Sequence, residues 1–153
     1  MHKLFISVAL LALAGCATSP IPEGYSGPIA TIRDSASSET ANRAQFFFLS
    51  EIDGNPVKNV LGATRQANSG RGFSLNTVPF SRSVPAKQAT FTIEGKIDYG
   101  APIQAIINMG TVYSVQKKVT FAPQSNRTYI VKGTLTANRR DVWIEDDQGK
   151  RIE

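Results

Sequence analysis

Alternation of apolar and polar residues is the clearest pattern in this chain, and its best example spans residues 89–99. The odd positions carry Ala, Phe, Ile, Gly, Ile and Tyr, whereas the even positions between them carry Thr, Thr, Glu, Lys and Asp. Successive side chains on a strand point to opposite faces of its sheet, so a period of two predicts one buried face and one face in water.

Shorter stretches predict further strands. Apolar residues recur at neighbouring or alternate positions in residues 29–32, 113–121, 129–137 and 142–144. Residues 46–49 (FFFL) are apolar throughout, which predicts a strand that is buried on both faces. The turn residues at 146–149 (DDQG) place Ile152 on a returning strand.

Turn-forming and breaking residues separate these strands. Asp53-Gly54 predicts a tight turn that leads into a strand at 57–60. Residues 35–44 are polar and predict a loop or a single helical turn. Residues 101–109 fit both a helix and a strand, and Gly100 and Pro102 favour a strand or irregular structure.

Together these elements predict an all-β fold, a single antiparallel β-sandwich of about seven to nine strands over residues 29–153. The length of 153 residues fits one domain, and 41% hydrophobic and 19% charged residues are typical of a globular chain. Residues 17–28 contain three Pro and two Gly, which predicts an extended linker rather than an edge strand around Ile21.

The first fifteen residues have the pattern of an export signal. His2 and Lys3 precede an apolar run over residues 4–14, which is too short for a membrane-spanning helix of about 20 residues. The next residue is Cys16, the one Cys of the chain. A secretory signal followed by an incidental Cys is the alternative interpretation.

Leu13-Ala14-Gly15-Cys16 resembles the bacterial lipobox. The resemblance implies cleavage before Cys16, which would then carry thioether-linked and amide-linked acyl chains such as palmitate. It divides the chain into a lipoprotein signal peptide (1–15), an acylated Cys with a Pro/Gly tether (16–28) and the sandwich domain. Ala17 in the next position implies sorting to the outer membrane rather than the inner membrane of the cell envelope.

The composition excludes several kinds of chemistry. One His, located in the signal segment, and one Cys exclude His-dependent catalysis and a metal centre built from several His or Cys side chains. No phosphate-binding glycine motif is present, and we expect no enzyme activity and no cofactor. The net charge of +5 comes from scattered basic residues, which does not predict nucleic-acid binding.

The candidate binding residues surround the single Trp, Trp143. Because Trp143 alternates with Val142 and Ile144, we expect it to point to the opposite face, where it either stacks on a ligand or is covered by protein. Four carboxylates lie close to it in the sequence: Asp141, Glu145, Asp146 and Asp147. They would form a solvated turn, bind Ca²⁺ or act as a pair in glycoside hydrolysis.

The second half of the chain resembles small periplasmic β-sandwich lipoproteins that have no assigned activity. The resemblance lies in Val84-Pro85-Ala86, Phe121-Ala122-Pro123, Tyr129-Ile130-Val131 and Val142-Trp143-Ile144. We therefore expect a non-enzymatic binding or scaffold module that is anchored to the membrane through Cys16 and has an envelope protein as its partner. The alternatives are a carbohydrate-binding or carbohydrate-processing protein that uses the Trp143 hairpin, and an inhibitor of an incoming hydrolase.

Overall fold

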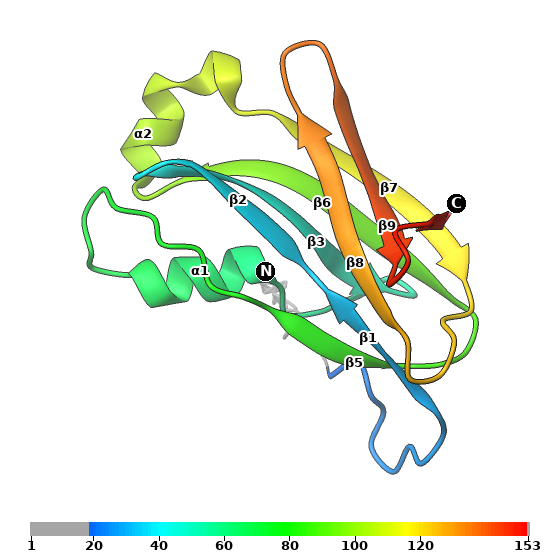
Figure 1. Cartoon of the computed structure of the whole chain (residues 1–153). Helices are drawn as coiled ribbons and strands as arrows, with labels where there is room; N and C mark the ends of the chain where they lie inside the picture. The colour runs from blue at the N-terminus through cyan, green and yellow to red at the C-terminus, as the bar shows by residue number, and fades with distance from the viewer. Residues whose placement is uncertain (1–18, 153) are drawn as a thin grey trace, which may run out of the picture.

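The computed structural model describes residues 19–152, which form ten strands, two α-helices and one 3₁₀ turn (Figure 1). The strands are β1 (Ile29–Arg33), β2 (Ser35–Thr40), β3 (Arg43–Ile52), β4 (Asn55–Pro56), β5 (Ser81–Pro85), β6 (Ala89–Tyr99), β7 (Ser114–Phe121), β8 (Thr128–Leu135), β9 (Arg140–Asp146) and β10 (Arg151–Ile152). The helical segments are α1 (Val60–Asn68), α2 (Pro102–Ile107) and η1 (Met109–Thr111). The predicted signal peptide over residues 1–15 and Cys16 lie outside the described residues.

The strands form two five-stranded sheets, which confirms the predicted β-sandwich. One sheet has the order β10-β9-β8-β1-β5, and the other has the order β2-β3-β6-β7 with β4 beside β3. One strand pair departs from the antiparallel arrangement, because β1 runs parallel to β8. Hairpins impose antiparallel pairing, but β1 and β8 are joined by most of the domain and are free of that constraint.

The chain changes sheets at Asp34, between β1 and β2. Residues 35–44 were predicted as a loop or a helical turn, and this is wrong because β2 pairs with β3 along the edge of the second sheet. The side chains of β2 are small and polar, and most of them are exposed. An edge strand of this kind buries no apolar face, so its sequence carries no period of two.

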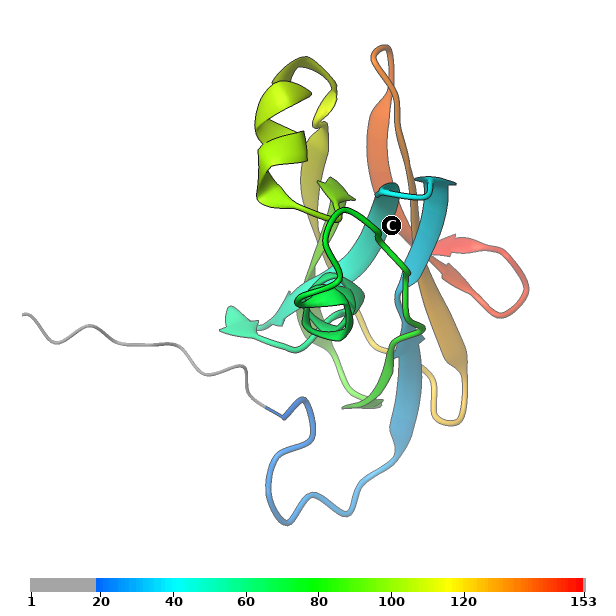
Figure 2. The same ribbon diagram turned by 90° about the vertical axis from the view of Figure 1, so that its left-hand side faces the viewer.

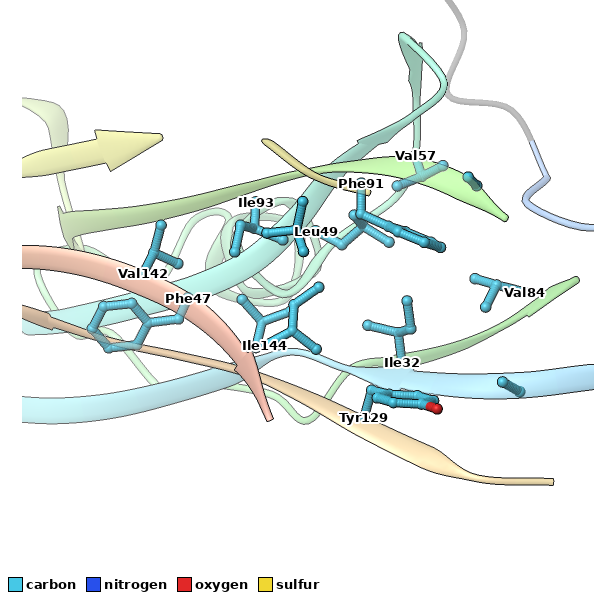
Figure 3. Packing of buried hydrophobic residues seen from close by; sticks show 14 of the residues in the cluster. Ile32, Phe47, Leu49, Val57, Val84, Phe91, Ile93, Tyr129, Val142 and Ile144 are labelled. Carbon is cyan, nitrogen blue, oxygen red and sulfur yellow. The ribbon is translucent and has the colours of Figure 1, made fainter. Parts of the chain in front are cut away.

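The main core lies between the two sheets (Figure 3). Phe47 and Leu49 of β3 point into it, where they meet Ile32, Ile144 and other side chains of the facing sheet. Phe46 and Phe48, the alternate residues of β3, lie in a second cluster with residues of α1 and Leu75. This arrangement confirms the prediction that residues 46–49 are buried on both faces.

The strand that was predicted at residues 57–60 is absent, except that the amide of Val57 donates a hydrogen bond to the carbonyl oxygen of Ser50 at 2.9 Å, and α1 begins at Val60. The Asp53-Gly54 turn is present, with φ angles of 50° and 79°, as a tight hairpin turn requires. The strand that follows it, β4, ends at Pro56. Asn59 then caps a helix, since its side chain accepts a hydrogen bond from the Gly62 amide at 3.0 Å.

Helix α2 replaces the predicted strand or irregular structure at residues 101–109. Pro102 was interpreted as a breaker, but it occupies the first turn of the helix, where its missing N–H costs nothing. The Gln104 side chain accepts a hydrogen bond from the amide of Ala101 at 3.0 Å and closes this turn. No residue of α2 is buried, so the period of its Ile residues does not mark a core face.

Candidate functional site

Trp143 lies on the outward face of β9. Val142 and Ile144 on either side of it are fully buried in the core, whereas Trp143 is half-buried. This confirms the predicted opposite orientation of the Trp side chain. Lys132 of β8 stands directly opposite Trp143 in the sheet, and β10 pairs with the other edge of β9.

The indole of Trp143 is held by charged neighbours on two sides. Its Nε1 atom donates a hydrogen bond to Oε1 of Glu145 at 2.7 Å, and the Nζ atom of Lys132 lies 2.7 Å from Oε2 of the same carboxylate. The guanidinium carbon of Arg151 lies 4.0 Å from a ring centroid of Trp143. Such a distance is typical of a cation–π contact.

Asp141 extends this arrangement. An Nη2 atom of Arg151 donates to Oδ2 of Asp141 at 2.7 Å, and Nη2 of Arg139 lies 3.8 Å from the same oxygen. One continuous set of contacts therefore links β8, β9 and β10. We call it the Trp143 face, and its members are Lys132, Arg139, Asp141, Trp143, Glu145 and Arg151.

Asp146 and Asp147 belong to the turn between β9 and β10. Oδ1 of Asp146 accepts hydrogen bonds from the amides of Gln148 at 3.0 Å and Lys150 at 2.8 Å. Arg127 lies 2.8 Å from Oδ1 of Asp147 and 3.7 Å from Oδ2 of Asp146. These contacts stabilise the turn, in keeping with the tendency of Asp to bond to its own local backbone.

The surroundings favour the ionised form of three of these carboxyl groups. The hydrogen bond from Arg151 lowers the pKa of Asp141, and the hydrogen bonds from Lys132 and Trp143 lower the pKa of Glu145. The pKa of Asp146 is lowered, mainly by the backbone amide of Lys150. Glycoside hydrolysis by a carboxyl pair needs one acid whose pKa is raised, and these three shifts have the opposite sign.

A polar cleft of about 570 Å³ lies at one end of the sandwich and was not predicted from the sequence. Its walls include Arg43, whose guanidinium carbon lies 5.8 Å from the Tyr99 ring centroid, and Tyr113, which has Arg140 at 4.5 Å. Arg43 also pairs with Glu39. These residues come from segments that are distant in the sequence, so no short sequence motif predicts the cleft.

Comparison with known proteins identified no relative of this chain. No family model, curated protein or solved structure matches this chain. Within residues 19–152, no group of three or more His, Cys, Asp or Glu side chains is placed to hold a metal ion. Neither helix in that part of the chain has the length and apolar character needed to cross a bilayer.

Proposed function

We propose that this chain is a lipid-anchored lipoprotein of the bacterial cell envelope that binds another envelope protein and catalyses no reaction. The observation that carries the proposal is the stacked pair of Trp143 and Arg151, held in place by Glu145 and Asp141. Trp and Arg are among the residues that contribute most to the binding energy of protein interfaces.

The ion pairs on the Trp143 face support this role. Binding costs free energy when flexible side chains become ordered, and each of these long side chains already has a fixed partner. The charges alternate in sign across the face, from Lys132 through Glu145 and Arg151 to Asp141. Such a pattern provides specificity for a partner with the complementary pattern.

The anchor rests on the lipobox resemblance at Leu13-Ala14-Gly15-Cys16, and Ala17 favours the outer membrane. Two or more acyl chains on Cys16 give stable membrane attachment, which a single chain does not. Intact-mass measurement of the protein from the membrane fraction tests this step. We expect a chain that begins at Cys16 and carries the mass of its acyl groups, whereas Cys16→Ser remains unprocessed.

Carbohydrate binding at the same hairpin is the second candidate. Asp141 and Glu145 flank the Trp143 ring with hydrogen-bond acceptors, an arrangement that suits the hydroxyl groups of a stacked sugar. A sugar on the face that Arg151 covers would first have to displace the guanidinium. A glycan array probed with wild type and Trp143→Ala tests this candidate, and binding that is lost in the variant would favour it over a protein partner.

A further inference from the structure

An exposed apolar surface lies on the segment that contains α2 and η1. Ile103, Ile106, Ile107 and Met109 are 50%, 60%, 75% and 73% exposed, and Phe73 in the loop after α1 is 61% exposed. Residues 101–112 contain no charged side chain. Single exposed apolar residues are common on soluble proteins, but a cluster of large ones marks a contact surface.

A groove of about 710 Å³ connects α2 with the loop after α1. Leu75 and Gly72 line it from the loop, and Ala105 and Ile106 line it from α2. Of the exposed apolar residues named above, Ile106 lines this groove, so α2 and the loop after α1 border the same surface. We call it the α1–α2 face, and it consists of α1, residues 69–75 and residues 101–112.

The charge around this surface is positive. No Asp or Glu occurs between Asp53 and Glu94 in the sequence, and Lys58, Arg65 and Arg71 are exposed within that interval. Arg65 pairs with Asp98 at 2.7 Å, whereas Lys58 and Arg71 form no ion pair among the described residues. Apolar side chains beside unpaired basic residues are typical of surfaces that rest on anionic membranes.

The position of this face relative to the predicted anchor is favourable. In Figure 2 the first described residues, α1 and α2 lie on the same side of the sheets, with the first residues and α2 towards opposite ends of the molecule, and the β9–β10 turn projects from the other side. Ser19 lines a pocket together with Asn55 and Val57, which lead into α1. Ser19 is three residues from Cys16, and three extended residues span roughly 10 Å.

We infer that the α1–α2 face rests on the bilayer to which Cys16 is anchored. Ile103, Ile106, Ile107 and Met109 enter the boundary between headgroups and acyl chains, while Lys58 and Arg71 contact anionic headgroups. This orientation directs the Trp143 face away from the membrane, where it is accessible to a partner. The inference rests on the lipid anchor that belongs to the proposed function.

Site-specific fluorescence on the full acylated protein tests the inference. The mature protein, reconstituted in phosphatidylethanolamine and phosphatidylglycerol vesicles, is prepared as Ile106→Cys and labelled with a polarity-sensitive dye. Gln148→Cys in the β9–β10 turn is the matched control, since both positions are exposed. We expect the dye at position 106 to shift to the blue and to lose most of its emission to brominated lipids, and the dye at position 148 to do neither.

Equal emission and equal quenching at the two positions would overturn the inference and leave the α1–α2 face free for a protein partner. Labelling of the wild type separates this result from a failure of the anchor. Cys16 is the one Cys of the chain, so an acylated wild-type protein takes up no dye. Dye uptake by the wild type would contradict both the anchor and the inference, whereas equal quenching without such uptake contradicts the membrane orientation alone.

Discussion

Asp34 and Arg82 form an ion pair that is buried where the chain passes from one sheet to the other. Their side chains are 0% and 6% exposed. The Asp34 carboxylate also accepts hydrogen bonds from the amides of Leu49 at 3.1 Å and Val60 at 2.9 Å. This one side chain thereby joins the crossing between β1 and β2 to β3, to the start of α1 and to β5.

Replacing Arg82 by Gln should destabilise the protein by about 3–5 kcal/mol, because it leaves the buried charge of Asp34 without a counter-ion. Chemical denaturation, followed through the emission of Trp143, measures this loss. Asp147→Asn is the matched control at an exposed ion pair, and it should cost less than about 1 kcal/mol. Equal losses in the two variants would show that the buried pair does not stabilise the crossing.

The close approach of Phe47 to Gly133 fixes the spacing of the two sheets. A Cβ atom added at Gly133 would lie 2.4 Å from the Phe47 ring and 2.5 Å from the backbone oxygen of Asp141. Gly133→Ala should therefore cost about 1–3 kcal/mol through overpacking. Gly110→Ala is the control, since nothing lies within 4 Å of the added atom, and its thermal unfolding should match that of the wild type.

Acid should weaken the Trp143 face. The pKa values of Asp141 and Glu145 in the folded protein lie below the ordinary values of 3.8 and 4.5. Their stabilising contribution is therefore fully present above about pH 4.5 and is lost as the pH falls through the lowered pKa values. Unfolding by urea at several pH values measures this loss.

The Glu145→Gln variant separates the acid-dependent loss of stability at Glu145 from the titration of Asp34. Burial raises the pKa of Asp34, so its contribution has the opposite sign and makes the fold less stable as the pH rises. The difference in unfolding free energy between wild type and Glu145→Gln should shrink on acidification. A difference that stays constant would show that the Lys132 and Trp143 contacts do not favour the ionised form of Glu145.

Arg151→Gln should expose the Trp143 ring with little effect on the fold. The guanidinium covers one face of the indole, and its ion pair with Asp141 is exposed and worth less than about 1 kcal/mol. Acrylamide should quench the emission of Trp143 more strongly in this variant. Lys150→Gln, a neighbouring change with no contact to the ring, should leave the quenching unchanged.

The sequence predicted the strands in which apolar and polar residues alternate. Residues 89–99 lie in β6, although Thr92 and Asp98 on its polar face are buried rather than in water, and the prediction for 129–137 extends two residues beyond β8. The orientation of Trp143 also followed from alternation. The sequence did not predict β2, because neither face of that strand is buried. It did not predict α2 either, because the Ile residues of α2 are exposed and do not pack in a core. The start of α1 was missed because its Asn59 cap follows directly on a turn and a short strand.

The residues of the Trp143 face were predicted in part. Asp141, Glu145 and Trp143 were recognisable because they are neighbours in the sequence on one predicted hairpin. The sequence did not reveal that Lys132 and Arg151 neutralise these carboxylates, since both partners come from other strands. The register between neighbouring strands determines which side chains pair in this way, as for Lys132 opposite Trp143. Some of these neighbours are distant in the sequence, as the parallel pairing of β1 with β8 shows.

In-cell crosslinking and affinity purification of wild type, Cys16→Ser and Trp143→Ala, followed by mass spectrometry, tests the central claim most directly. The account predicts one dominant envelope protein with the wild type, and its loss in both variants. Trp143→Ala should still be acylated and folded, so this loss would place the contact on the Trp143 face. Recovery of the same protein at equal levels with Trp143→Ala, or of only abundant outer-membrane proteins in all three samples, would contradict the account.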